Sequence, residues 1–178
     1  MRALSILAVL SLAAAPLTAQ DTVQDAAPAR AEDVATIDGI LSALYESISG
    51  PAGAERDWPR MRSLFVPDGR LMPTGKRADG TGVRLSWGVE EYITRAGPGL
   101  KENGFFEREI GRRTDQFGQV VQVFSTYESR RAATDPEPFM RGINSIQLWN
   151  DGSRWWVVSI LWQNESPDTP IPAQYLRN

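Results

Sequence analysis

The chain has 178 residues, with 19 lysines and arginines, 22 aspartates and glutamates, and neither histidine nor cysteine. A formal net charge of −3 without a run of basic residues gives no reason to expect nucleic acid or an anionic membrane as a partner. The lack of cysteine excludes disulfides and thiolate catalysis, and the lack of histidine removes the commonest general base and zinc ligand. Any catalysis must therefore use carboxylates, tyrosine, lysine or arginine, or a bound cofactor; we expect no cofactor and no metal.

Residues 1–19 have the composition of a secretory signal peptide. Arg2 provides the positive start, residues 3–15 are apolar, and Ala19 is a small residue at the expected cleavage position. The apolar stretch is too short for a membrane span of roughly 20 residues. We therefore predict an exported protein, periplasmic or extracellular, that keeps no membrane anchor after cleavage. Residues 20–32 are rich in alanine, proline and polar residues and are predicted to form a disordered leader.

Three helices are predicted before the strands. The first follows from apolar residues at helical spacing and should end at Gly50-Pro51: Ile37, Ile40, Leu41, Leu44, Tyr45 and Ile48. A shorter helix should start near Asp57, whose side chain can cap free N–H groups. A third should begin at Glu90-Glu91, where negative charge suits a helix start, and end at Gly97-Pro98-Gly99.

The remaining residues are predicted to form strands. Short strands are expected at 70–74 and 82–87. Two long hairpins follow, one with strands 104–114 and 119–131 around Phe117-Gly118, the other with strands 139–149 and 154–163 around Asp151-Gly152. Residues 166–178 contain several prolines and should form an extended tail. This order predicts an α+β fold over residues 33–165, with N-terminal helices packed on one face of a strongly curved antiparallel sheet.

Two segments resemble a known group of proteins. The stretch "ALYESISGPAGAERDWPRMRSLFVPDGRL" leads two helices into a strand, and in "GSRWWVVSILWQ" the residues Gly152, Trp155, Val157 and Gln163 fill a characteristic last-strand pattern. On these segments and on the element order, residues 33–165 resemble the nuclear transport factor 2-like superfamily, SnoaL-like branch. The resemblance implies a cone-shaped domain with a pocket at one end, often a homodimer through the outer sheet face. The family includes isomerases, dehydratases and cyclases as well as non-catalytic binding domains.

The last hairpin is apolar on both faces. If Asp151-Gly152 is a two-residue turn, the alternation of side chains places Trp155 in the core. It places a second apolar set on the outer face: Gln147, Trp156, Val158, Ile160 and Trp162. We predict that this outer set is the interface of a homodimer. The alternative is that the proline-rich tail covers Trp156 and Trp162.

The inner face should carry the ligand-binding residues. With Phe117-Gly118 as the turn, the polar residues assigned to it are Arg108, Ser125, Tyr127, Asn144, Ser159 and Gln163. The Tyr127 hydroxyl is expected at the open end of the pocket, near Arg108 and Asn144, as an anchor for the ligand. The same register places Glu107, Glu109 and Glu128 on the outer face. A single bulge in strand 104–114 would instead turn Glu109 inward.

These assignments favour an exported binding domain for a small apolar or amphipathic molecule. One alternative is a cofactor-independent isomerase, dehydratase or hydrolase in which Tyr127 and a pocket carboxylate, Glu109, do the chemistry. Another is a protein-interaction module that uses the outer sheet face. The direction of Glu109 relative to the cavity separates the enzyme from the other two possibilities.

Overall fold

The computed structural model describes residues 28–176, so the predicted signal peptide and most of the predicted leader lie outside the described residues. The described chain forms helices and strands in this order: α1 (Ala31–Val34), α2 (Ile37–Ile48), α3 (Trp58–Leu64), β1 (Phe65–Lys76), β2 (Gly82–Arg84), α4 (Val89–Asn103), β3 (Phe106–Phe117), β4 (Val120–Arg130), β5 (Met140–Asn150), β6 (Trp155–Asn164) and the 3₁₀ helix η1 (Ala173–Tyr175). Within residues 28–176, no helix has the length and apolar character needed to cross a membrane.

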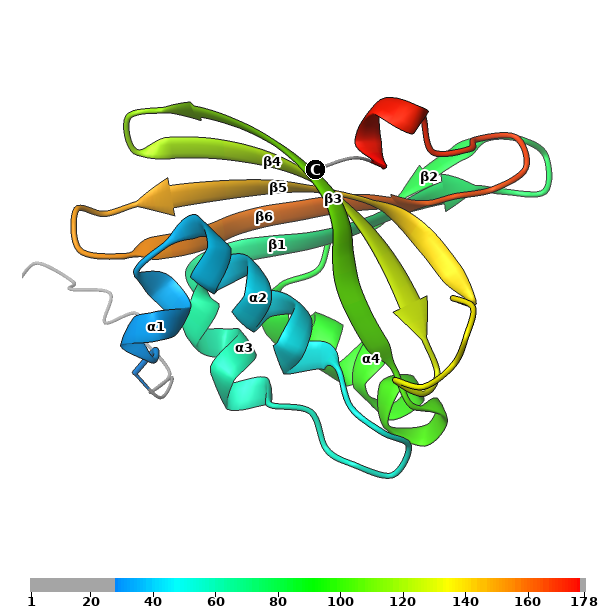
Figure 1. Cartoon of the computed structure of the whole chain (residues 1–178), viewed down its shortest axis with the longest axis horizontal. Coiled ribbons are helices and arrows are strands. Elements are labelled where there is room, and N and C mark those ends of the chain that lie inside the picture. Colours follow the sequence, from blue (N-terminus) through cyan, green and yellow to red (C-terminus); the bar gives the residue numbers. More distant parts are fainter. Residues whose placement is uncertain (1–27, 177–178) are drawn as a thin grey trace, which may run out of the picture.

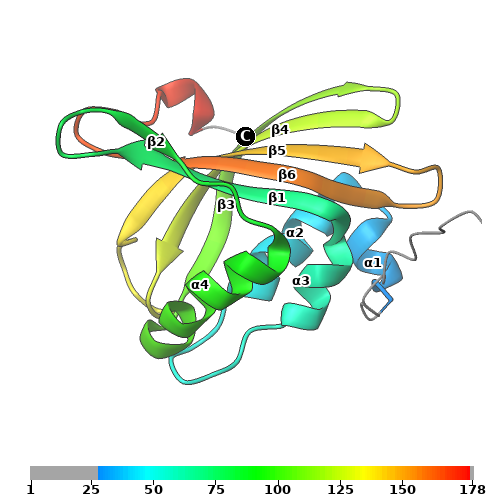
Figure 2. The same ribbon diagram turned by 180° about the vertical axis from the view of Figure 1, so that it is seen from behind.

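The strands form one six-stranded sheet in the order β2-β1-β6-β5-β4-β3. All the α-helices lie on one side of this curved sheet, as Figures 1 and 2 show from opposite directions. The predicted α+β architecture is confirmed, but the sheet is mixed because β1 runs parallel to β6 while the other neighbours are antiparallel. The core between the helices and the sheet includes side chains that are almost fully buried: Ile40, Leu41, Met61, Leu64, Val121, Ile146 and Val157.

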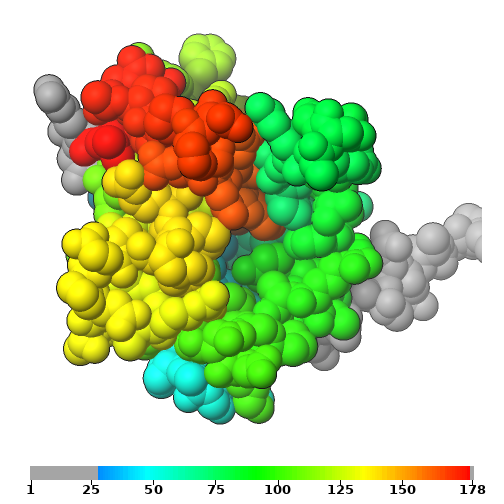
Figure 3. Space-filling view, turned by 90° about the vertical axis from the view of Figure 1, so that its right-hand side faces the viewer, coloured from blue at the N-terminus to red at the C-terminus, as the bar shows by residue number. Residues whose placement is uncertain are grey.

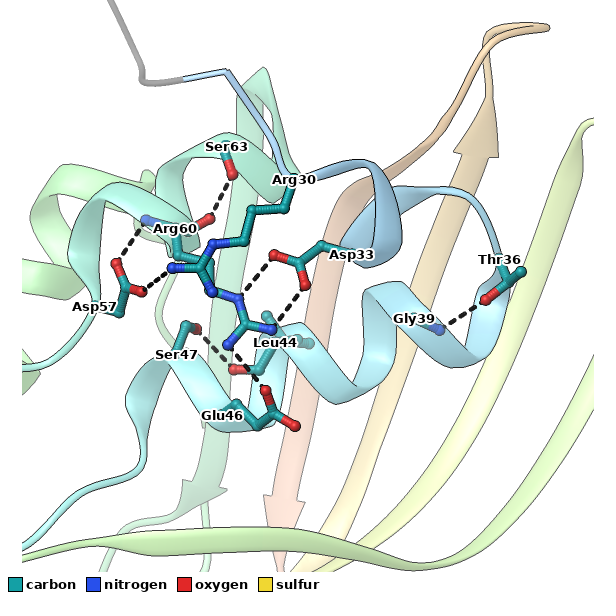
Figure 4. A network of polar contacts seen from close by, with 10 residues as sticks. All are labelled: Arg30, Asp33, Thr36, Gly39, Leu44, Glu46, Ser47, Asp57, Arg60 and Ser63. Atoms are coloured by element: carbon teal, nitrogen blue, oxygen red, sulfur yellow. Dashed lines mark hydrogen bonds and ion pairs between the residues drawn. The ribbon is translucent and has the colours of Figure 1, made fainter.

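Polar contacts fix the starts of the N-terminal helices and join them together. The Thr36 hydroxyl accepts a hydrogen bond from the backbone N–H of Gly39 and so caps α2, and Asp57 caps α3 as predicted. The Arg60 guanidinium in α3 pairs with Asp33 of α1 at 2.7 Å and with Glu46 of α2 at 2.9 Å (Figure 4). Its hydrogen bonds lower the pKa of Asp33, whose side chain is otherwise buried.

Helix α4 is longer than predicted. It continues through Gly97-Pro98-Gly99 and ends only at Gly104, where φ is +68° and a glycine is required. Gly97 is buried against the Trp58 ring, since a Cβ at that position would lie only 3.2 Å from the ring. Gly97 therefore serves close packing of α4 rather than its termination.

Both hairpin turns differ slightly from the predicted ones. Phe117 pairs with Val120 around a tight turn that includes Gly118, with φ of +56°. In the second hairpin Asn150 pairs with Trp155, and the turn is closed by the Asp151 carboxylate, which accepts hydrogen bonds from the N–H groups of Ser153 and Arg154. These shifts alone do not exchange the two faces of the sheet, because the pairing moves by an even number of residues.

Two β-bulges exchange the faces. In β3, Glu109 pairs with Tyr127 and Gly111 with Thr126, so Ile110 between them has no partner. In β6, Val157 pairs with Leu148 and Ser159 with Gln147, so Val158 is skipped. A bulge bends its strand and turns every residue beyond it to the other face. The predicted outward positions are therefore wrong for four residues that face the helices: Glu107, Glu109, Ile160 and Trp162.

The C-terminal tail covers the outer face at Thr126 and Phe124, rather than Trp156 and Trp162 as the alternative prediction had it. The Thr126 hydroxyl donates to the Tyr175 carbonyl at 2.6 Å, and the Tyr175 ring packs against Phe124 with centroids 5.1 Å apart. Trp156 instead donates from its indole nitrogen to Asp151 and lies under the Arg154 guanidinium. Because Trp162 faces the helices, tail cover explains the position of neither tryptophan.

Candidate functional site

The concave side of the sheet and the helices enclose a cavity of about 210 Å³. Figure 3 shows a hollow on this side of the molecule, bordered by α4, by the segment that follows β4 and by the end of β6. Most of the lining is aliphatic or aromatic: Leu44, Ile48, Met61, Leu71, Trp87, Phe105, Met140, Ile160 and Trp162. The polar atoms that reach the cavity come from a small group of side chains: Tyr45, Tyr92, Glu107, Tyr127 and Asn144.

Glu107 is the acidic residue of the cavity lining. The bulge at Ile110 turns its side chain inward, where one carboxylate oxygen accepts a hydrogen bond from the Ser129 hydroxyl at 2.9 Å. Burial raises the pKa of Glu107 from 4.5 to about 7, and hydrogen bonds from Ser129 and Asn144 only partly oppose this rise. No lysine or arginine of the described chain lines the cavity, so Glu107 has no counter-charge there.

Three tyrosines surround Glu107, and their hydroxyl groups differ in availability. Tyr45 shares a hydrogen bond with Ser125 at 2.6 Å and accepts another from the Asn144 amide at 3.1 Å. Tyr127 donates to Oδ1 of Asn164 at 2.7 Å. The Tyr92 hydroxyl has no hydrogen-bond partner among the residues that the structure describes, so it is free to bind a ligand.

Burial first, and the nearby Glu107 carboxylate second, raise the pKa of each of these tyrosines above its ordinary value. All three hydroxyls therefore keep their protons near neutral pH. Each is a potential hydrogen-bond donor, and none is a base.

Glu109 faces the same side of β3 as Glu107 but does not line the cavity. Its carboxylate pairs with Arg112 at 2.7 Å and accepts a hydrogen bond from the Ser125 hydroxyl. Ser125 also bonds to Tyr45, which does line the cavity, so two side chains separate Glu109 from the interior. The carboxylate position expected for Glu109 is occupied by Glu107. Between residues 28 and 176, no three acidic side chains come close enough together to hold a metal ion.

The predicted ligand-binding residues are only partly brought together. Tyr127 and Asn144 line the cavity, and Ser125 lies behind Tyr45. Arg108 is on the outer face, where its side chain is 69% exposed and pairs with Glu128, so the expected closeness of Arg108 and Tyr127 is wrong. The bulge at Val158 also leaves two of the predicted residues outside the cavity lining: Ser159 and Gln163.

Four residues that define the cavity were not predicted from the sequence: Trp87, Tyr92, Glu107 and Trp162. One signal for the second bulge was available. Without a bulge, the inner positions of the last strand would include Ser159 and Gln163 where the core needs apolar side chains, while Ile160 and Trp162 would face outward. No comparable signal marks the bulge at Ile110.

No family model matches the sequence, and no curated protein matches it either. Several solved structures do match the chain in three dimensions. The structure named LinA is 10% identical over 78% of this chain and 89% of its own, with a TM-score of 0.54. Hexachlorocyclohexane dehydrochlorinase LinA-type3 from Novosphingobium barchaimii LL02 is 10% identical over 74% and 86%, with a TM-score of 0.53. An NTF2-like protein of unknown function from Silicibacter pomeroyi DSS-3 is 14% identical over 74% and 94%, with a TM-score of 0.49.

At these identities the likeness shows the fold alone. The chain has the α+β nuclear transport factor 2-like fold, with N-terminal helices packed on a six-stranded mixed sheet. The structures that match with a TM-score above 0.5 include a dehydrochlorinase and an uncharacterized protein with a cystatin-like fold from Caulobacter vibrioides. Function therefore has to be argued from the cavity itself.

Proposed function

We propose that the cavity binds a small molecule and that Glu107 moves a proton on it without a cofactor, as in isomerases and dehydratases. The observation that carries the proposal is the desolvated Glu107 carboxylate in an apolar cavity, with its pKa raised to about 7. A general base works best when its pKa lies near the operating pH, because it is then partly ionised and still basic. A surface glutamate would be a far weaker base.

In this proposal Glu107 removes a proton from a carbon next to a carbonyl group. The electron pair left by the C–H bond moves toward the carbonyl oxygen, which gains negative charge. The free Tyr92 hydroxyl donates a hydrogen bond to that oxygen, in an interior where such a bond stabilises charge more than it does in water. The protonated Glu107 then returns the proton to another carbon, or assists the loss of a leaving group.

We also propose the family branch, the cellular location and the class of ligand for this activity. The sequence pattern around Trp155 supports membership of the SnoaL-like branch, and residues 1–19 support export. The apolar lining supports a small apolar or amphipathic ligand. A binding domain without turnover is the second candidate, because the cavity lining is mostly apolar whether or not Glu107 acts as a base.

The proposal can be tested by following exchange of carbon-bound hydrogen in deuterated water. Small ketones are incubated with the purified protein, and loss of the C–H signal is measured by proton NMR. We expect Glu107→Gln to reduce catalysed exchange by roughly 100-fold or more, the usual contribution of a general base. Glu109→Gln is the matched control, since Glu109 lies on the same face of β3 outside the cavity. Equal exchange by the unmodified protein and Glu107→Gln would leave binding without turnover as the function.

A further inference from the structure

Three aromatic rings of the cavity lining pack against one another edge to face. The ring centroids of Tyr92 and Trp162 are 6.4 Å apart, with an angle of 85° between the ring planes. Those of Trp87 and Trp162 are 6.5 Å apart, at 61°. All three rings line the cavity together with Glu107. The ligand space therefore has aromatic surfaces on several sides and a carboxylate on another.

The charges of this space are unbalanced. A buried carboxylate ordinarily has a cationic partner or a set of hydrogen bonds that replaces one, because removing an unpaired charge from water is costly. Among residues 28–176, the groups that face Glu107 are neutral: Tyr45 from α2, Tyr92 from α4, Tyr127 and Ser129 from β4, and Asn144 from β5. Arg95 lies over one face of the Trp87 ring, with its Cζ 5.6 Å from the centroid, but it pairs with Glu91 and does not line the cavity.

We propose that the cavity takes a small organic cation, an alkylated ammonium, with its positive charge against the faces of Trp87, Tyr92 and Trp162 and opposite the Glu107 carboxylate. Aromatic faces attract cations electrostatically, and the attraction is strongest where water is excluded. Alkyl groups on the nitrogen suit these walls, because they need no hydrogen-bond acceptors and bury apolar surface. The missing counter-charge of Glu107 is then supplied by the ligand.

This inference names the substrate class of the proposed site and rests on the proposed function only in taking Glu107 as the group that meets the ligand. It excludes small carboxylates and phosphates, because a second negative charge beside Glu107 would be repelled with no cation in the lining to offset it. The affinity for such a cation should also depend on pH. An ammonium ion favours the ionised carboxylate, so its affinity should rise by up to tenfold per pH unit below about 7 and level off above it.

The test is calorimetric titration with two matched probes, choline and 3,3-dimethyl-1-butanol, which differ in replacing the charged nitrogen by carbon. At pH 8 we expect choline to bind at least tenfold more tightly than the neutral probe. Glu107→Gln should reduce this preference to what the aromatic rings alone provide, whereas Glu109→Gln should keep it in full, with circular dichroism to show that both variants are folded. Below pH 7, binding of choline should be accompanied by proton release, seen by repeating the titration in buffers of different ionisation enthalpy.

Two results would overturn the inference: equal or tighter binding of 3,3-dimethyl-1-butanol, or no heat of binding from choline at millimolar concentration in the folded protein. Neither result touches the exchange experiment on ketones. If the neutral probe is preferred and Glu107-dependent exchange is intact, the proposed function holds with an uncharged substrate. If choline binds and no ketone exchanges, the cavity is a cation site and the proposed proton transfer is wrong.

Discussion

Glu107 and Glu109 project from the same face of β3, yet only Glu107 opens onto the cavity. Glu109 has the Arg112 guanidinium and the Ser125 hydroxyl as partners, whereas Glu107 has no cationic partner in the cavity lining. Two glutamate side chains on one strand thus have different electrostatic environments. The charge of Glu109 is compensated by Arg112, whereas the charge of Glu107 is not compensated in the cavity. The uncompensated carboxylate should therefore affect stability as well as binding.

The stability of the protein should reflect the raised pKa of Glu107. In the unfolded chain this carboxyl ionises near 4.5, and in the folded protein at about 7. Folding is therefore favoured by protonation, and the contribution is fully present below pH 4.5 and lost as the pH rises through 7. Glu107→Gln has no ionisable group at this position and should not lose stability in this way. The free energy of unfolding of the variant minus that of the unmodified protein should therefore increase by a few kcal/mol between pH 5 and pH 8, at about 1.4 kcal/mol per unit of pKa difference. Urea unfolding at both pH values measures it, and a constant difference would contradict the assignment.

Tyr127→Phe tests the bond between Tyr127 and Asn164. The ring and its burial are kept, and only the hydrogen bond to Asn164 is lost. We expect a loss of about 1 kcal/mol in unfolding free energy. Asn164→Ala should cost less in the Tyr127→Phe background than in the unmodified protein, because the two residues act on one bond. Chemical denaturation of the single and double variants gives the coupling, and fully additive effects would mean that the bond does not form in solution.

Asp33→Asn tests the junction of the first three helices. The hydrogen bonds from Arg60 hold the pKa of Asp33 below its ordinary value, so the carboxylate stabilises the fold above about pH 4 and loses this effect as the pH falls through the folded-state pKa. We expect Asp33→Asn to cost about 1.5–3 kcal/mol at pH 7, the range for hydrogen bonds to charged groups. Unfolding experiments at pH 7 and pH 3 should show the cost shrinking at low pH.

The control for that experiment is Asp38→Asn. Asp38 also pairs with an arginine, Arg112, but its side chain is 84% exposed. An exposed ion pair contributes little, so this variant should unfold almost like the unmodified protein. A similar cost for Asp33→Asn and Asp38→Asn would mean that the buried junction adds no stability beyond that of a surface pair.

The outer sheet face is proposed to form a homodimer around Trp156 and Val158. Both side chains remain on that face although Ile160 and Trp162 do not, and a stable interface should bury at least about 1,000 Å² in total. Trp156→Glu would place a charge in this interface and should give a monomer in sedimentation velocity. Leu85→Glu, a change at another exposed apolar residue outside the central strands, should leave the association intact. A monomeric unmodified protein at micromolar concentration would refute the dimer.

Export is proposed from residues 1–19 alone. Expression of the full-length chain in a Gram-negative host, followed by N-terminal sequencing of the mature form, should give a start at or near Gln20 in the periplasmic fraction. The substitution Leu7→Arg interrupts the apolar stretch and should retain the precursor in the cytoplasm. Soluble cytoplasmic protein that begins at Met1 in the unmodified chain would exclude cleavage.

The helices and hairpins could be predicted because their signals are local. Apolar spacing identified α2, Asp57 identified the start of α3, and Asp151-Gly152 identified the last hairpin. The parallel pairing of β1 with β6 joins segments far apart in the chain, and no short pattern encodes it. The bulge at Ile110 is equally hidden, since Ile110 is an ordinary strand residue, whereas the apolar Ile160 and Trp162 gave a signal for the bulge at Val158. Tyr127 and Asn144 were therefore placed correctly in the cavity, whereas Glu107 and Trp162, which lie beyond the bulges, were placed outside it.

The bulge at Ile110 has a consequence for how such a protein can diverge. Deleting this one residue would restore regular pairing in β3 and leave Glu109 opposite Tyr127 and Gly111 opposite Thr126, so Glu107 would still face the cavity. The cavity would keep its acidic interior and lose only the local bend that the bulge gives to the strand. A single-codon deletion could thus change the shape of this scaffold's binding space without changing its charge.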